Sequence, residues 1–375
     1  MIKNWDEHQE KRRIPESHKM VSCYAAFNHL RLNRWGGMSP CCFSERRQPW
    51  KKGEDNLKNY WFEGLNKQYQ ESFLNDELHP GCVICKNRIE ANELSPIIEY
   101  DQNMGDDRLE HALNPNRWPK IVEFEISNLC NLECEMCHAG LSSKLYMGRD
   151  KDIIHTRPDV YDLPNIYDND ENLNLLIEEF KDFIPHLDEI RFVGGEPFAH
   201  KGMFKIAKVI ADLNPGCRLQ VCTNGTVYNT KVEEICKNNN LRLTISIDSV
   251  IEEEYKQIRI GAKYQDTYNN IQKLKEVLGS DRITVNATFM SVNAENIDQL
   301  FLYAIENNFR TFVNVYIREW REHTKDWSLY NLSRDVKDKS IEKLKVILNQ
   351  LDPLNETHKS HNTEIEKVIS LLETS

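Results

Sequence analysis

Along residues 118–320 the apolar positions follow two alternating patterns, short nearly continuous runs and runs with helical spacing. Between the short runs, apolar residues recur every three or four positions, which is typical of helices with one buried face. The short runs predict six strands, at 121–127, 188–194, 218–224, 241–248, 283–290 and 311–317. Three helices are marked by Leu175, Ile177, Phe180, Phe183 and Ile184; by Phe204, Ala207, Ile210 and Leu213; and by Tyr268, Ile271, Leu274 and Leu278.

Apolar strands that alternate with helices favour a parallel sheet with helices on its outer face. Six such units fit an open, partial (β/α)6 TIM-like barrel better than a closed eight-fold one, so the expected fold class is α/β. In this architecture ligands bind at the C-terminal ends of the strands. The motifs described below fall at those ends.

The N-terminal region, residues 1–115, does not follow this pattern and predicts a small α+β domain. Residues 29–43 predict a β-hairpin with Gly36-Gly37 in its turn. The stretch from Asn56 to about Leu74 predicts a helix. The Asn- and Pro-rich stretch 112–119 marks the expected boundary with the barrel.

The barrel is expected to span 116–320 and to be followed by a charged helical extension at 321–375. We expect this extension to pack against the rest of the chain, with no chemistry of its own. One face of it is apolar and consists of Leu344, Ile347, Leu348 and Leu351.

The charge and the N-terminus narrow the classes of function. The formal net charge of −11 argues against non-specific binding to nucleic acid or to an anionic membrane. The chain has no apolar run of about 18 residues, and residues 1–19 lack the apolar core of a signal peptide. We therefore expect a cytoplasmic protein, in which thiols stay reduced. Its 11 cysteines then point to metal or cluster ligation.

The strongest signal is a C-x3-C-x2-C triplet, Cys130, Cys134 and Cys137, directly after the first barrel strand. A loop with this spacing can place three thiolates around one face of a four-iron cluster, which leaves the fourth iron open for a substrate. The alternative is a structural zinc site with His138 as fourth ligand. Because His138 is adjacent to Cys137, the geometry for zinc is poor.

Further polar motifs follow the later strands. Gly194–Pro197 ends the second strand, and its glycines let the backbone approach a ligand closely. Thr223–Thr226 follows the third strand, and Ser246–Ser249 ends the fourth. By strand alternation, Ser246 and Asp248 should point to the same side. An ordinary Gly-Pro turn is the alternative explanation for Gly194–Pro197.

The segment CNLECEMC, residues 130–137, resembles the signature of the radical S-adenosylmethionine (SAM) superfamily. Met136 stands where that signature usually has an aromatic residue. The other motifs follow in the expected order, so the resemblance covers about residues 118–320. It implies a [4Fe–4S] cluster on Cys130, Cys134 and Cys137, and reductive cleavage of SAM to a 5′-deoxyadenosyl radical that abstracts hydrogen from a substrate. It also implies a reductase partner such as flavodoxin or ferredoxin.

The resemblance also implies roles for individual residues. The Gly194–Pro197 segment would bind the amino group of SAM through its backbone, with help from Glu196. Ser246 would bind the ribose, and Arg259 would pair with the carboxylate, which an arginine can do bidentately. A solvated helix charge is the alternative for Arg259. The full set of expected cofactor-binding residues is Met136, Gly194, Gly195, Glu196, Pro197, Thr223, Asn224, Ser246, Asp248 and Arg259.

The cysteines of the N-terminal region resemble those of the twitch domain, the short relative of the SPASM domain, although such domains usually follow the barrel. This resemblance implies an auxiliary iron–sulfur cluster on Cys23, Cys41, Cys82 and Cys85. Four thiolates close a cluster, which suits electron transfer. Cys42 is an alternative to Cys41, since neighbouring side chains of a hairpin face opposite sides. A structural zinc site is the other alternative.

The resemblance leaves the substrate open. Twitch and SPASM relatives modify ribosomally made peptides, oxidise protein side chains, or dehydrogenate small alcohols and sugars. We expect a peptide or protein side chain, with a small-molecule dehydrogenase or epimerase as the alternative. A non-catalytic iron–sulfur or zinc carrier or scaffold is the hypothesis from another class. A carrier needs the cysteines but has no use for Gly194–Pro197, Ser246–Ser249 or Arg259.

Overall fold

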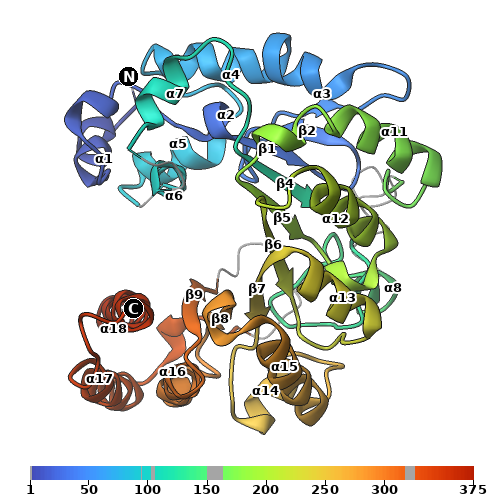
Figure 1. Ribbon diagram of the computed structural model, residues 1–375. Helices are drawn as coiled ribbons and strands as arrows, with labels where there is room; N and C mark the ends of the chain where they lie inside the picture. The colour runs from blue at the N-terminus through green and yellow to red at the C-terminus, as the bar shows by residue number, and fades with distance from the viewer. Residues whose placement is uncertain (1, 94, 103–105, 150–163, 317–325) are drawn as a thin grey trace. The chain divides into compact units, whose positions relative to one another are not determined.

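The computed structural model describes residues 2–93, 95–102, 106–149, 164–316 and 326–375 (Figure 1). The chain divides into two compact units. The first unit comprises Met1–Ile126, Leu163–Phe192 and Lys205–Arg218; the second comprises Ser127–Asp162, Val193–Phe204 and Leu219–Ser375. Among the described residues, no helix is both long enough and apolar enough to cross a membrane.

The first unit holds a five-stranded part of the sheet with the strand order β3-β2-β1-β4-β5. Its strands are β1 His29–Leu32, β2 Gly37–Ser39, β3 Gln48–Pro49, β4 Ile121–Glu125 and β5 Glu189–Val193. Its helices are α1 Trp5–Lys11, α2 Ala25–Asn28, α3 Asn56–Lys58, a π-helical turn Asn59–Glu63, α4 Leu65–Leu74, α5 Val83–Glu90, α6 Ile97–Gln102, α7 Arg108–Leu113 and α11 Asp170–Phe180.

The predicted hairpin at 29–43 is confirmed, because β1 and β2 pair antiparallel. Gly36 lies in the turn with a φ of +82°, which a residue with a side chain rarely adopts. Gly37, expected in the turn, is instead the first residue of β2. The helix predicted from Asn56 to about Leu74 is present but is interrupted at Gly64.

The N-terminal hairpin extends the sheet of the barrel. Strand β1 lies beside β4 (Figure 1) and pairs with it in parallel. In this pairing Arg31 is opposite Glu123. The Arg31 guanidinium donates hydrogen bonds to the carboxylates of Glu123 and Glu125. The N-terminal region is therefore built onto the first strand of the barrel rather than hanging from it by a linker.

The helices of the first unit enclose an apolar core that includes Phe27, Tyr69 and Phe73. A buried ion pair lies beside this core: Arg12 donates from Nε and Nη2 to the Asp101 carboxylate at 2.8 and 2.6 Å. Both side chains are almost completely buried. Burial raises the pKa of Asp101, and the guanidinium of Arg12 opposes that shift.

The second unit holds the strands β6-β7-β8-β9 in sequence order. The pairs β7–β8 and β8–β9 are parallel. The strands are β6 Arg218–Thr223, β7 Asn240–Ser246, β8 Ile283–Phe289 and β9 Arg310–Val315. The helices are α8 Ser143–Met147, α13 Thr230–Asn238, α14 Glu252–Ile258, α15 Tyr264–Leu278, α16 Ile297–Glu306, α17 Arg334–Leu348 and α18 Glu356–Thr374; α12 Lys201–Leu213 begins in this unit and ends in the first.

The α/β fold and all six predicted barrel strands, now β4 to β9, are confirmed. In the described part of the chain, the strand order does not close into a ring, so the sheet is open. The three predicted helices correspond to α11, α12 and α15, and the helical extension to α17 and α18. Helix α11 ends at Phe180, so Phe183 and Ile184, expected in the same helix, lie beyond it. Leu213, expected on a buried face, is instead 48% exposed at the end of α12.

Helix α18 covers the free edge of β9 with polar side chains. Glu364 accepts a hydrogen bond from the backbone N–H of Val313 at 2.8 Å, and Lys367 donates to the backbone carbonyl of Val313 at 2.5 Å. Ser360 donates to the Thr311 carbonyl at 3.2 Å. These side chains satisfy backbone groups that would otherwise invite another strand.

Candidate functional site

The loop with the three cysteines follows β4 in the chain and belongs to the second unit. Its middle is hydrogen-bonded to the chain around the end of α14: Glu133 N–H donates to the Ile260 carbonyl and Glu135 N–H to the Ile258 carbonyl, both at 2.9 Å. Beyond the cysteines, the Ser142 hydroxyl donates to the Leu132 carbonyl at 2.7 Å. The loop is thus fixed on both sides of Cys134 although it forms no helix or strand.

The three thiols differ in their surroundings. Cys134 is buried, whereas Cys130 and Cys137 are half-buried. Burial raises the pKa of Cys134 to about 12, and the positive charge of Arg259 opposes this shift. Burial also raises the pKa of Cys130, opposed by hydrogen bonds from the Leu132 backbone and the Asn224 side chain. A metal or cluster bound here would have to displace these protons.

The glycines of Gly194–Pro197 allow close contact with the cysteine loop. Gly194 and Gly195 have φ angles of +83° and +56°. A Cβ atom on Gly195 would lie 2.5 Å from the Leu129 carbonyl oxygen, so no other residue fits without a shift of the backbone. The next residue, Glu196, donates its N–H to the same Leu129 carbonyl at 2.8 Å.

The Glu196 carboxylate ties Gly194–Pro197 to the segment after β6. It is completely buried and accepts hydrogen bonds from Phe198 N–H at 3.1 Å, from the Thr223 hydroxyl at 2.8 Å and from Asn224 N–H at 2.7 Å. Burial raises the pKa of Glu196 to about 7, opposed by these hydrogen bonds. The Glu196 carboxylate therefore holds the Gly194–Pro197 segment in place against Thr223 and Asn224.

The Asn224 side chain reaches the cysteine loop. Its Nδ2 lies 3.8 Å from the Cys130 Sγ and 3.1 Å from the Asn131 Oδ1. Asn131 in turn donates to the Thr226 hydroxyl at 2.9 Å. Sequence reasoning did not identify Asn131 as part of the site, although its position inside the cysteine motif was a usable signal.

The chain leaves the strand before Asp248, so the expectation that Ser246 and Asp248 share a side by strand alternation is wrong. Strand β7 ends at Ser246, and Asp248 has a φ of +65°. Ser246 is half-buried and close to Asn286, whose Nδ2 is 3.5 Å from the Ser246 hydroxyl. Asp248 is instead completely buried.

Asp248 and Arg259 form a buried ion pair beside the cysteine loop. Arg259 Nε donates to one carboxylate oxygen of Asp248 at 2.6 Å, and Thr288 N–H donates to the other at 2.7 Å. Arg259 Nη1 lies 3.8 Å from the Cys134 Sγ. Arg259 is thus not a solvated helix charge: it is 7% exposed and links the strand end to a cysteine.

The two remaining expected residues lie nearby in the chain's second unit. Met136 packs against a small apolar cluster of Ile258, Met290, Tyr316 and Trp327. Pro197 begins a short 3-10 helix, Pro197–Ala199, and is buried. The cluster that receives Met136 contains two aromatic residues that no motif marked.

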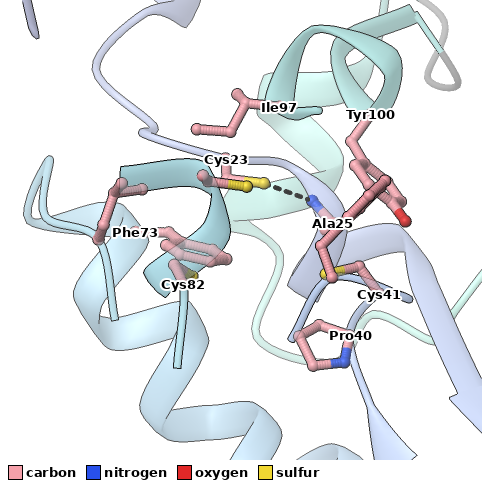
Figure 2. A pocket seen from close by; sticks show the side chains of 11 residues that line it. Cys23, Ala25, Pro40, Cys41, Phe73, Cys82, Ile97 and Tyr100 are labelled. Carbon is pink, nitrogen blue, oxygen red and sulfur yellow. Dashed lines mark hydrogen bonds between the residues drawn. The ribbon is translucent and has the colours of Figure 1, made fainter. Parts of the chain in front are cut away.

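In the first unit, Cys23, Cys41, Cys82 and Cys85 line one buried cavity. Figure 2 shows Cys23, Cys41 and Cys82 around the same space, with Phe73, Pro40 and Tyr100 completing its wall. Cys82 is the N-cap of α5 and Cys85 lies in its first turn, which explains the C-x2-C spacing. Burial raises the pKa of all four thiols.

Cys41 lines this cavity, whereas Cys42 is exposed and lies 4.0 Å from the Tyr100 hydroxyl. The reason expected for this difference is wrong. Strand β2 ends at Ser39, so both cysteines lie in the turn after the hairpin and not on opposite faces of a strand. Tyr100 lines the cavity and also lies near Cys42. It was not identified from the sequence, because no motif spacing marks it.

In the described part of the chain, no three His, Cys, Asp or Glu side chains lie close enough to share a single metal ion. A zinc ion needs its ligands around one point. A four-iron cluster binds each thiolate on a separate iron, so its ligands are farther apart. The donor sets, three thiols on the loop and four around the cavity, are of the kind that binds iron–sulfur clusters through Cys thiolates.

Parts of the chain are similar to known proteins. The family model described as "Radical SAM superfamily" matches residues 124–304. The GTP 3′,8-cyclase of Clostridium botulinum (strain Okra / Type B1) is 30% identical over 113 residues, which cover 30% of this chain and 35% of that protein. The GTP 3′,8-cyclase of Crocosphaera subtropica (strain ATCC 51142 / BH68) is 28% identical over 194 residues, which cover 50% of this chain and 52% of that protein.

The chain thus spans about half the length, or less, of these two relatives. Among solved structures, SuiB of Streptococcus suis bound to S-adenosylmethionine is 16% identical and has a TM-score of 0.42. That match covers 86% of this chain and 69% of SuiB.

Proposed function

The chain belongs to the radical SAM superfamily, with the family's domain at residues 124–304, and we propose that it is an enzyme that reductively cleaves S-adenosylmethionine to abstract hydrogen from a substrate. The observation that carries this proposal is the contact between the cysteine loop and the other motifs: Gly194–Pro197 bonds to Leu129, Asn224 contacts Cys130, and Arg259 contacts Cys134. A simple electron carrier would need the cysteines without these neighbours.

Cys130, Cys134 and Cys137 would hold the [4Fe–4S] cluster. When bound, it supplies one electron to the sulfonium of SAM, whose C–S bond breaks to give methionine and a 5′-deoxyadenosyl radical. The chain's own residues fix the geometry around it. Glu196 holds two strand ends together, and Gly195 lets the backbone lie against the cysteine loop.

We propose the remaining contacts with SAM because the resemblance to the superfamily implies them. The backbone of Gly194–Pro197 would bind the amino group of SAM, Ser246 the ribose, and Arg259 its carboxylate while keeping the ion pair with Asp248. Thr223, Asn224 and Met136 are the other residues that we propose for binding SAM. In this assignment Glu196 and Asp248 act through the residues that they hold, because their carboxylates already accept hydrogen bonds from the chain.

For the first unit we propose an auxiliary iron–sulfur cluster on Cys23, Cys41, Cys82 and Cys85. The support is their shared cavity, whose wall is otherwise apolar and aromatic. Such a cluster would accept an electron from the product radical or relay one to the first cluster. The corresponding division is a twitch-like domain at 1–115, a barrel at 116–320 and a helical extension at 321–375.

For the substrate we propose a peptide or protein side chain, on the resemblance of the N-terminal cysteines to twitch and SPASM domains. A small molecule is the second candidate, and the name of the curated relatives, GTP 3′,8-cyclase, favours a nucleotide in that case. We place the enzyme in the cytoplasm, reduced by a flavodoxin or ferredoxin.

The first experiment is anaerobic reconstitution with iron and sulfide, reduction with dithionite, and addition of SAM. We expect 5′-deoxyadenosine from the parent protein and none from a variant with Cys130, Cys134 and Cys137 replaced by Ala. Cys217→Ala is the matched control, because Cys217 is a buried cysteine outside both sets. If the parent protein binds a four-iron cluster on the cysteine loop but forms no 5′-deoxyadenosine, the result favours a non-catalytic electron carrier.

The second experiment separates the substrate classes. SAM turnover is measured with GTP and, separately, with peptides encoded next to the gene, and the product masses are compared. Loss of two hydrogens or a new cross-link in a peptide supports the first candidate, and a cyclised nucleotide supports the second.

A further inference from the structure

We propose that Asn224 and Arg259 raise the reduction potential of the cluster by donating N–H groups to the sulfurs of Cys130 and Cys134. This inference rests on the proposed function, since it requires a cluster on the cysteine loop. It assigns both residues a role toward the protein's own thiolates, in addition to any role toward SAM.

The geometry provides one donor for each of two cysteines. Asn224 Nδ2 lies 3.8 Å from the Cys130 Sγ, and Arg259 Nη1 lies 3.8 Å from the Cys134 Sγ. Sulfur is larger than oxygen, so N–H···S contacts are longer than N–H···O bonds. The donors come from different elements, one after β6 and the other directly after α14.

The orientation of the Asn224 amide is fixed by its other contacts. Its Oδ1 accepts from the Thr226 N–H at 2.9 Å and from the Thr226 hydroxyl at 2.6 Å. Its backbone N–H is held by Glu196 at 2.7 Å. An amide whose oxygen already faces two donors must present its nitrogen on the other side, which here is the side of Cys130.

Arg259 is fixed just as firmly. Its Nε is paired with Asp248 at 2.6 Å, and Asp248 is held by Thr288 N–H at 2.7 Å. Asp248 keeps a positive φ of +65°, which is unfavourable for a residue with a side chain and persists only when its surroundings impose it. The carboxylate thus aims the guanidinium, and Nη1 is the part that reaches Cys134.

Reduction adds one electron to the cluster and makes its sulfurs more negative. Hydrogen bonds to the sulfurs stabilise the reduced form more than the oxidised form, so they raise the potential. Asp248 offsets much of the positive charge of Arg259, so the contact depends on the N–H group as well as on the charge. Removal of either donor should therefore lower the potential.

The test is a redox titration of the reconstituted protein without SAM, followed by electron paramagnetic resonance (EPR). The variants are Asn224→Leu and Arg259→Lys, with the N-terminal cysteines Cys82 and Cys85 replaced by Ala throughout, so that only one cluster is observed. At the midpoint potential of the parent, we expect the ratio of reduced to oxidised cluster to fall about tenfold in each variant, which corresponds to about 59 mV for one electron.

Two controls share the surroundings but not the sulfur contact. Asn270 donates to the carbonyls of Gly225 and Thr226, so Asn270→Leu disturbs the same loop as Asn224. Arg149, which follows α8, donates to Glu135 of the cysteine loop at 2.7 Å, so Arg149→Gln removes a positive charge that is paired with this loop. Both controls should keep the potential of the parent.

A measurement that leaves Asn224 and Arg259 unchanged guards against variants that fail to fold. Protein labelled with 15N-arginine is reduced and examined by pulsed EPR, and we expect a nitrogen coupling from Arg259 across the N–H···S contact. Unchanged potentials in both variants, equal shifts in the controls, or no arginine coupling would overturn the inference while leaving the proposed function intact. If iron and sulfide analysis finds no four-iron cluster in the parent, the proposed function itself fails.

Discussion

The two sets of cysteines differ in their neighbours, although both consist of thiols brought together by loops and helix ends. The cysteine loop in the second unit has polar groups close to its sulfurs, among them Asn224 and Arg259, whereas half-buried cysteines occur in both sets. The cavity in the first unit is lined by apolar and aromatic residues such as Phe73 and Ile97.

The difference is compatible with the separate tasks that we propose for the two sites. Nearby hydrogen-bond donors suit a site that must admit a polar cofactor. An apolar cavity with four cysteines suits a closed site whose function is electron transfer, because nothing needs to enter it. The predictions below test this contrast, from the largest expected effect to the smallest.

The largest effect should come from the cysteines themselves. Cys134→Ala should reduce 5′-deoxyadenosine formation to the background level, because one thiolate of the open site is lost.

Replacing Cys82 and Cys85 by Ala should remove about four irons of about eight and abolish substrate turnover, while uncoupled cleavage of SAM continues. Iron analysis measures the bound iron, and chromatography measures 5′-deoxyadenosine and the substrate product. Full substrate turnover in the Cys82/Cys85 variant would remove the auxiliary site from the mechanism.

The buried ion pair of the first unit should be the next most sensitive. Asp101→Ala leaves the Arg12 guanidinium buried without its carboxylate. Breaking such a pair costs about 3–5 kcal/mol of unfolding free energy. Denaturant unfolding should show this loss, with the exposed pair Lys52–Glu171 as a control, since Glu171→Ala should cost less than about 1 kcal/mol. Equal costs would mean that burial of the pair is unimportant.

The glycine against the cysteine loop should follow. Gly195→Ala places a Cβ 2.5 Å from the Leu129 carbonyl and retains an unfavourable φ of +56°. We expect a loss of about 1–3 kcal/mol and a lower yield of bound iron on the loop. Gly216→Ala, where the nearest atom is 3.7 Å away, should change stability by less than about 0.5 kcal/mol. Normal iron binding in Gly195→Ala would show that the close contact is dispensable.

The smallest effect concerns acid stability at the edge of the second unit. Burial lowers the pKa of His361 to about 4, and its Nδ1 lies 3.0 Å from the Thr311 hydroxyl. The unfolded chain binds this proton at an ordinary histidine pKa, so stability is present above about pH 6.5 and is lost as the pH falls toward 4. His361 is completely buried, and between about pH 6.5 and about pH 5 we expect a loss of about 1–2 kcal/mol of unfolding free energy. His361→Gln should flatten this part of the pH–stability profile, and an unchanged profile would assign the loss to other groups.

The sequence predicted the parts of the molecule that depend on local pattern. Strands β4 to β9 follow from runs of apolar residues, and the cysteine triplet follows from spacing alone. The parallel pairing of β1 with β4 was not predictable, since residues 31 and 123 are far apart in the chain and nothing local marks the pair.

The site shows the same limit on a smaller scale. Asp248 was identified as a polar residue at a strand end and Arg259 from the family resemblance, yet their mutual ion pair depends on a single residue with positive φ. The choice between Cys41 and Cys42 depends on how the turn after β2 is oriented. Both are set by tertiary packing, which overrides the alternation that a strand would impose.

The central claim is that the iron without a cysteine ligand on the loop of Cys130, Cys134 and Cys137 binds SAM directly. Electron–nuclear double resonance on the reduced protein with 15N- and 17O-labelled SAM measures this contact. We predict hyperfine coupling to both the amino nitrogen and the carboxylate oxygen, and loss of both couplings in Cys134→Ala. A cluster whose spectrum is identical with and without SAM, or a loop that carries only zinc, would contradict the account.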